Sequence, residues 1–205
     1  MKKDITFDWC GIDYGSKLAG TTVICAGHEG SPRLFLWQSA PKQDADAFLQ
    51  DWLLEHRPSL IFIDAPLSLP QAYRQKEALA EADFFYRQGD RALGAMSPMF
   101  LGGLTARAMR LQALMRESAG LLFYETYPAQ QAARLGLAAL AYKKDPAAIP
   151  AVLEAILQNS PFEAEAKDFG NWHRVDALLA LLGAYRYAKG QAKAYGEATE
   201  GQIWV

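Results

Sequence analysis

The chain has 205 residues, of which 51% are hydrophobic and 21% charged, and its formal net charge is −2. This length fits one domain, or one domain with an insertion, and the composition is ordinary for a globular protein with a sizeable core. The slight acidity argues against bulk electrostatic binding of long nucleic acid, although a local basic groove is compatible with it. No segment approaches the roughly 18 consecutive apolar residues of a membrane span.

The N-terminus and the cysteines both favour a cytoplasmic localisation. Two N-terminal lysines resemble the start of a signal peptide, but Asp4 and Asp8 interrupt the apolar run that should follow. Cys10 and Cys25 lie on predicted strands and suit a reducing compartment, where they would be small core residues.

The first predicted strand, residues 5–13, ends in Asp13 and is followed by turn-forming residues. Residues 19–26 are strongly β-forming, so the two segments predict a hairpin. A carboxylate at the end of a buried strand is costly unless it is hydrogen-bonded or bound to a cation. Two interpretations of Asp13 stay open: it accepts hydrogen bonds from the turn amides of Gly15 and Ser16, or it is the first ligand of a metal site.

Residues 33–39 form a third predicted strand, which completes an antiparallel meander. A helix is predicted over residues 44–56 from the spacing of its apolar residues, and Pro58 stops it. Residues 60–64 have the pattern of a strand buried on both faces of a parallel sheet, and this strand also ends in an aspartate, Asp64. A right-handed crossover is the natural connection between the meander and this strand.

Residues 66–118 are predicted to form a helical insertion after the strand that ends at Asp64. Helices are expected over residues 72–88 and 105–117, with an irregular, glycine-containing stretch at 89–103 between them. A mobile cover over a site would lie in this position.

A fifth strand is predicted at residues 121–125, and it ends in Glu125. Pro128 suits the first turn of the helix that follows, and Asp145 caps a further helix that extends to about residue 158.

Asn171 caps a final apolar helix, predicted at residues 172–189, whose second turn contains Asp176. Residues 202–205 are expected to dock as a short strand. The chain shows no internal repeat and no low-complexity linker.

Three antiparallel strands, a helix and then parallel strands with intervening helices resemble the order of the ribonuclease H-like fold. We therefore predict one α/β domain over residues 1–205, with a mixed five-stranded sheet of order 3-2-1-4-5 and helices on both faces. Asp13 and Asp64 would then end neighbouring parallel strands at a switch point, roughly 4–6 Å apart, where like charges raise a pKa or demand a cation. Glu125 ends the next strand, and the last helix could bring Asp176 to the same point.

The four carboxylates together favour a metal site. Oxygen ligation of this kind suits Mg²⁺ or Mn²⁺ and not Zn²⁺. Each residue has an ordinary alternative: Asp64 in a turn, Glu125 paired with an arginine, and Asp176 favoured by the helix dipole. If each carboxylate had only its ordinary role, the carboxylates would rarely all lie at one edge of the sheet.

Several motifs resemble those of known families. Residues 11–17, Gly-Ile-Asp-Tyr-Gly-Ser-Lys, resemble the opening motif of the ribonuclease H-like superfamily, in particular of RuvC-type resolvases and their YqgF-type relatives. His-Arg-Val-Asp-Ala at 173–177 resembles the helix that completes the resolvase metal site. Nearly the whole chain is similar to the family of predicted RNase H-like nucleases, domain of unknown function 429. That resemblance is carried by the motif at 173–177 and by Ile-Asp-Ala-Pro-Leu at 63–67, Gly-Asp-Arg at 89–91 and Tyr-Glu-Thr-Tyr-Pro at 124–128.

The resemblance implies a nuclease in which Asp13 bridges two divalent ions, with Asp64, Asp176 and Glu125 holding them for an in-line phosphodiester displacement. His173 lies on nearly the same helix face as Asp176 and would move a proton or contact a phosphate, although a half-exposed histidine with neither role is the ordinary alternative. The candidate phosphate contacts are Lys17, Arg91, Arg107 and Arg110, for which solvated surface charges are the alternative.

Two other classes stay open. An actin-like phosphotransferase has a similar phosphate-binding hairpin but needs two such domains, and Ala65-Pro66 stands where its second glycine-rich turn should follow Asp64. A non-catalytic module on the same fold would bind nucleic acid, nucleotide or protein, and metal dependence separates it from a nuclease. The candidate substrates are DNA, RNA and small phosphoesters.

Overall fold

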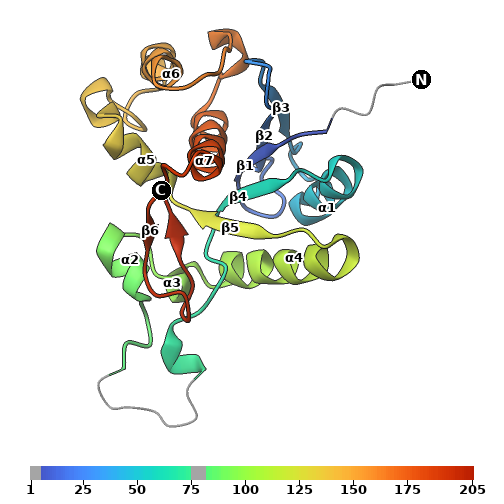
Figure 1. Ribbon diagram of the computed structural model, residues 1–205, viewed down its shortest axis with the longest axis vertical. Coiled ribbons are helices and arrows are strands. Elements are labelled where there is room, and N and C mark those ends of the chain that lie inside the picture. The colour runs from blue at the N-terminus through green and yellow to red at the C-terminus, as the bar shows by residue number, and fades with distance from the viewer. Residues whose placement is uncertain (1–5, 75–81) are drawn as a thin grey trace.

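A mixed β-sheet with helices on both faces forms the centre of the molecule (Figure 1). The computed structural model describes residues 6–74 and 82–205. In this part of the chain the sheet has seven strands in the order β3-β2-β1-β4-β5-β7-β6. The order predicted for the first five strands is confirmed, and the prediction of only five strands is wrong. The C-terminal tail supplies the two further strands, β6 (Ala194–Tyr195) and β7 (Ile203–Trp204).

The three N-terminal strands form the predicted antiparallel meander, but each is shorter than predicted. They are β1 (Trp9–Asp13), β2 (Val23–Gly27) and β3 (Phe35–Gln38). Residues 17–20 form a turn in which Gly20 has a φ of 72°, so β2 cannot begin at residue 19. The carbonyl group of Phe7 accepts a hydrogen bond from the amide of Ser59, and that of Asp8 accepts one from Leu60, the first residue of β4, although neither Phe7 nor Asp8 belongs to β1. Residue 5 lies outside the described part of the chain.

The parallel part of the sheet begins with β4 (Leu60–Asp64), which pairs with β1 on one side and with β5 (Phe123–Thr126) on the other. Helix α1 (Ala45–His56) makes the crossover between the meander and β4. The side chain of Asp44 caps α1 by accepting hydrogen bonds from the amides of Asp46 and Ala47.

Helix α7 (Trp172–Ala188) lies directly on β1. A Cβ atom on Gly11 would lie 2.0 Å from the backbone nitrogen of Leu181 and 2.3 Å from the carbonyl oxygen of Ala177. Only glycine permits this approach of a helix backbone to a strand. Since Gly11 lies two residues before the end of β1, the contact brings the first half of α7 to the carboxyl end of that strand.

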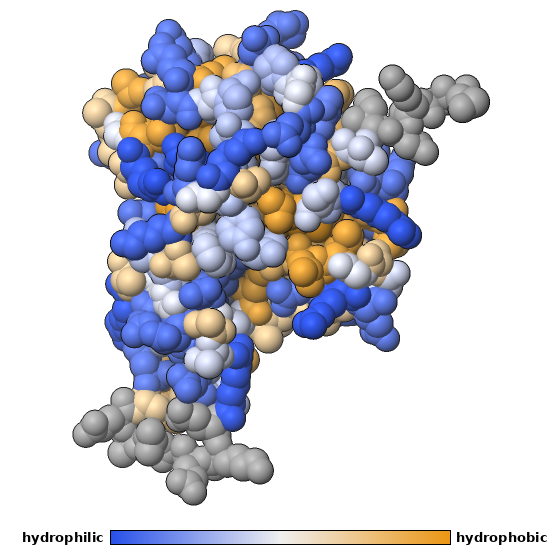
Figure 2. All heavy atoms as spheres, viewed as in Figure 1, coloured by the Kyte–Doolittle hydropathy of each residue, from blue (hydrophilic) through white to orange (hydrophobic). Residues whose placement is uncertain are grey.

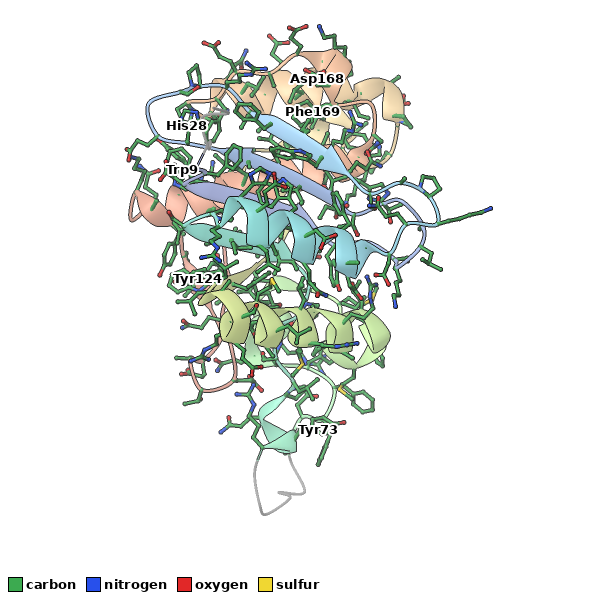
Figure 3. The ribbon with its side chains drawn as sticks, turned by 90° about the vertical axis from the view of Figure 1, so that its right-hand side faces the viewer. Trp9, His28, Tyr73, Tyr124, Asp168 and Phe169 are labelled. Atoms are coloured by element: carbon green, nitrogen blue, oxygen red, sulfur yellow. The ribbon has the colours of Figure 1, made fainter. Side chains whose placement is uncertain are left out.

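Two hydrophobic layers enclose the sheet. Helix α7 covers one face together with α5 (Pro128–Arg134) and α6 (Ile149–Gln158). Helices α1 and α4 (Gly103–Ala119) cover the other face, and Figure 3 shows both in front of the sheet. The two cysteines are free and buried in these layers, as predicted for core residues.

The insertion between β4 and β5 differs from the prediction in its first half. In place of a helix over residues 72–88, the described part has a 3₁₀ turn at Gln71–Tyr73 and irregular chain at 82–87, while residues 75–81 lie outside the described part. The side chain of Asp83 accepts hydrogen bonds from two following amides and holds that chain in a turn. The stretch predicted to be irregular, 89–103, contains most of α2 (Gln88–Leu93) and all of α3 (Pro98–Leu101). The predicted helix over 105–117 is confirmed as α4.

The elements after β5 largely follow the prediction. Helix α5 begins at Pro128, Asn171 caps α7, and Asp145 caps a 3₁₀ turn (Pro146–Ala148) that leads into α6. Two further 3₁₀ turns are Leu137–Leu140 and Ala166–Asp168. In the described ranges, every helix is too short or too polar to cross a membrane.

On the face shown in Figure 2, one apolar region lies over β5 and α1, and a second lies at the upper left, near α6. Leu54 of α1 and Leu122, just before β5, are among the exposed large apolar residues. Leu122 precedes the first residue of β5, whereas Asp64 is the last residue of the parallel strand β4. Leu122 and Asp64 therefore lie at opposite ends of the parallel strands.

Candidate functional site

The last residues of β1 and β4 are Asp13 and Asp64, and they occupy paired positions across the two parallel strands. This is the juxtaposition that the strand order predicts. Asp13 is buried and Asp64 is partly buried. Burial, followed by the negative charges of Asp13 and Asp176, raises the pKa of Asp64 well above its ordinary value. The three aspartates therefore act on one another electrostatically.

Helix α7 places His173 against Asp13. The side chain of Asn171 caps the helix, and His173 follows in the first turn. The Nδ1 atom of His173 lies 2.8 Å from Oδ2 of Asp13, and this hydrogen bond raises the pKa of His173 although partial burial opposes the rise. The amide of Gly15, one of the turn groups considered for Asp13, instead donates to the hydroxyl of Thr22 at 3.0 Å.

Asp176 is almost fully buried, and two residues from another segment hold its carboxylate. The Nζ atom of Lys143 lies 2.5 Å from Oδ2, and the hydroxyl of Tyr142 donates to Oδ1. Burial raises the pKa of Asp176 to about 6, with Lys143 acting in the opposite direction. The sequence carries no motif that marks Tyr142 or Lys143; only the helix cap at Asp145 stands out in this segment.

Glu125, predicted at the margin of a metal site, forms a buried ion pair with Arg87. Both guanidinium Nη atoms lie 2.6 Å from its carboxylate oxygens, and the amide of Leu67 donates to the same group at 2.9 Å. Burial raises the pKa of Glu125, and Arg87 opposes this rise. The side chain of Arg87 is only 1% exposed and also pairs with Asp90 at 2.6 Å. The structure thus shows the arginine-paired alternative for Glu125, and Asp90 of the Gly-Asp-Arg motif serves the same ion pair.

Arg107, a predicted phosphate contact, is held by protein groups. Its guanidinium group lies within 2.6–3.1 Å of the carboxylate oxygens of Asp46 and donates to the carbonyl oxygen of Gly15 at 3.1 Å. The same group lies 4.6 Å above the ring of Tyr14. Arg107 therefore ties α4 to α1 and to the turn after β1.

The other predicted phosphate contacts lie away from the aspartates. Lys17 and the exposed Arg110 line a hollow of about 190 Å³ together with Arg107, and the lining includes none of Asp13, Asp64 and Asp176. Lys17 pairs there with Asp44 at 3.1 Å.

Arg91 lies on the insertion. Its guanidinium group pairs with Asp83 at 2.8 Å and lies 3.7 Å above the ring of Tyr86. Of the predicted site residues, the structure therefore brings together Asp13, Asp64, Asp176 and His173 at one place.

A family model described as "Protein of unknown function (DUF429)" matches residues 11–200. The chain belongs to this family. All the residues that converge at the carboxyl ends of β1 and β4 lie inside the matched range. Among solved structures, the DUF429 chain is similar to one titled "Thermus thermophilus RuvC structure", at 19% sequence identity and a TM-score of 0.42, with 90% of this chain and 97% of that chain covered. No curated protein sequence matches the chain significantly.

The site of this DUF429 protein is not a preformed cage of metal ligands. Within residues 6–74 and 82–205, no three histidine, cysteine or acidic side chains are arranged to hold a metal ion. Lys143 instead pairs with Asp176, and His173 is hydrogen-bonded to Asp13. The chemistry of the donor set nevertheless suits Mg²⁺ or Mn²⁺, since Asp13 and Asp64 end paired strands and Asp176 lies on the helix packed against them.

Proposed function

We propose that this DUF429 protein is a divalent-metal-dependent nuclease that hydrolyses phosphodiester bonds. The observation that supports this proposal is the convergence of Asp13, Asp64 and Asp176, from β1, β4 and α7, at the carboxyl ends of two parallel strands. Buried carboxylates that lie near other negative charges gain free energy when a cation binds between them. Without a bound cation, the same arrangement of carboxylates costs free energy.

In this proposal the three aspartates would hold Mg²⁺ or Mn²⁺. A bound ion would polarise a phosphoryl oxygen and activate water at neutral pH. His173 is hydrogen-bonded to Asp13 through Nδ1, and its side chain is 44% exposed, so its Nε2 is free to exchange a proton with the substrate or the solvent. We assign Glu125 to the anchoring of the insertion, because Arg87 already holds both of its oxygens.

Nucleic acid and small phosphoesters are both candidate substrates. Among the residues that line the hollow beside α4, the exposed Arg110 is the candidate phosphate contact, whereas Lys17 pairs with Asp44 and Arg107 with Asp46. The chain carries no large excess of positive charge, which favours a short or locally contacted substrate over a long duplex bound by bulk electrostatics.

Cleavage assays on single-stranded, duplex, hybrid and four-way-junction substrates test the proposal. We expect cleavage in Mg²⁺ or Mn²⁺ and not in Ca²⁺ alone, whose coordination is looser. Asp13→Asn should lower the rate by roughly two orders of magnitude or more, because it removes a ligand and not a core contact. Asp51→Asn, an exposed position on α1, is the matched control and should leave the rate unchanged. Absence of cleavage of every substrate with either ion would contradict the proposal.

A non-catalytic binding module is the second candidate, and one observation favours it: Lys143 already pairs with Asp176, and His173 is already hydrogen-bonded to Asp13. Such a module would bind its nucleic acid or nucleotide equally well with and without a divalent ion. Fluorescence anisotropy of a labelled oligonucleotide in EDTA and in Mn²⁺, with wild type and Asp13→Asn, separates the two candidates.

A further inference from the structure

The ammonium group of Lys143 is paired with Asp176, one of the three clustered aspartates. Its Nζ atom lies 2.5 Å from a carboxylate oxygen of Asp176. Asp176 follows His173 by three residues on α7, and Nδ1 of His173 lies 2.8 Å from Oδ2 of Asp13. Lys143 therefore approaches the end of β1, where Asp13 and Asp64 are paired.

The backbone around Lys143 holds the side chain in this place. Ala141 and Lys143 both have left-handed backbone conformations, with φ values of 57° and 60°. Residues other than glycine seldom adopt this region, and they persist there only when the surroundings enforce it. The residue between them, Tyr142, packs edge to face on Trp172 at 5.3 Å and donates its hydroxyl to Asp176.

Lys143 reaches the cluster from the surface. Its side chain is 47% exposed, whereas that of Asp176 is 3% exposed. The contact therefore depends on the fixed turn at residues 141–143 and on the charge of the carboxylates, and not on burial of the lysine itself. A lysine held in this way brings one positive charge and three N–H donors.

Two-metal hydrolytic sites place two cations about 3.5–4 Å apart around shared carboxylates. We propose that Lys143 provides one of the two cations of this cluster, so that the protein binds a single divalent ion. The inference rests on the proposed function, because it assumes that the aspartates bind a metal. The ion would take Asp13 and Asp64, while Asp176 stays paired with Lys143. The ammonium group can neutralise charge and donate to a phosphate oxygen, but only the metal ion would activate water.

The number of bound Mn²⁺ ions tests this inference. Isothermal titration of the purified chain should give one ion per wild-type molecule and two per molecule of Lys143→Met, which keeps the length of the side chain but removes its charge. Electron paramagnetic resonance should show isolated Mn²⁺ in the wild type and a spin-coupled pair in the variant. Lys144→Met, at the exposed neighbouring position, is the matched control and should bind one ion. Lys143→Gln repeats the test if the methionine variant folds poorly by circular dichroism.

The possible outcomes separate this inference from the proposed function. Two ions in the wild type, or one ion in both Lys143 variants, would overturn the inference and leave a metal-binding site in place. No bound ion in any of these proteins would overturn the proposed function, and the inference with it.

Discussion

Asp13 and Asp64 occupy the same register position on adjacent parallel strands, β1 and β4. Neighbouring strands lie about 4.8 Å apart, and paired residues of a parallel ladder direct their side chains to the same face of the sheet. The strand register therefore keeps the two residues side by side. Their electrostatic interaction follows from the sheet topology.

Stability should depend on pH through Asp64. Burial and the neighbouring aspartates raise its folded pKa, whereas in the unfolded chain the value is about 3.9. The unfolded state therefore releases this proton first, and stability is lost as pH rises from about 4 through the folded pKa. In metal-free buffer near pH 8, Asp64→Asn should raise the free energy of unfolding by about 1–3 kcal/mol, and the gain should disappear near pH 4.

Urea denaturation at the two pH values measures this difference. Asp51→Asn, on the exposed side of α1, serves as the control and should change the free energy of unfolding by less than about 0.5 kcal/mol at both pH values. A variant at position 64 that is less stable than wild type near pH 8 would show that the carboxylate is stabilised by its surroundings and not strained by them.

Divalent ions should raise the melting temperature through Asp13. At roughly 100 times its Kd, a ligand that binds only the folded state adds about 2.7 kcal/mol, which is roughly 5–10 °C for a chain of this size. Asp13→Asn should remove most of the shift produced by Mn²⁺, and EDTA should reverse the shift in the wild type. If the variant keeps the full shift, the ions bind elsewhere on the molecule.

The location of the aspartates was predictable because it depends on topology. The carboxyl ends of parallel strands meet at one edge of a sheet, so the spacing of the strands, together with the resemblance to the ribonuclease H-like strand order, pairs Asp13 with Asp64. Lys143 was not predictable, since its contact with Asp176 depends on two left-handed backbone positions that no apolar periodicity encodes. Arg87 lies in a segment whose composition resembles that of a surface helix. Only the folded structure shows that its side chain is buried and paired with two carboxylates.

The strands at one edge of the sheet were also hard to predict, because each of them is very short. Strands β6 and β7 have two residues each, and two residues are too few to show the alternation of apolar and polar side chains that identifies a strand. They exist because the tail folds back on β5: Ile203 and Trp204 pair with Glu125 and Thr126. Contacts of this kind are fixed by tertiary structure, so the sequence predicts a docking tail but not a sheet of seven strands.

Loss of Arg87 should destabilise the whole domain. Arg87→Met would leave the carboxylates of Glu125 and Asp90 buried without a partner, and breaking a buried ion pair from one side costs about 3–5 kcal/mol. Arg91→Met is the matched control: Arg91 also pairs with an aspartate of the insertion, Asp83, but its side chain is 60% exposed, so the cost should be at most about 1 kcal/mol. If chemical denaturation shows that Arg87→Met and Arg91→Met lose the same free energy of unfolding, the ion pairs of Arg87 are not buried and unscreened.

The packing of α7 on β1 should control both stability and metal binding. In Gly11→Ala the new methyl group would meet the backbone of α7 at 2.0 Å, so helix or strand must shift, at a cost of about 1–3 kcal/mol or more. Because α7 carries His173 and Asp176, the same shift should move them relative to Asp13 and reduce the Mn²⁺-induced rise in melting temperature. Gly27→Ala, where the nearest atom would lie at 3.5 Å, is the matched control on β2 and should keep the full rise. A Gly11→Ala protein with wild-type stability and an undiminished response to Mn²⁺ would show that this contact does not position the helix.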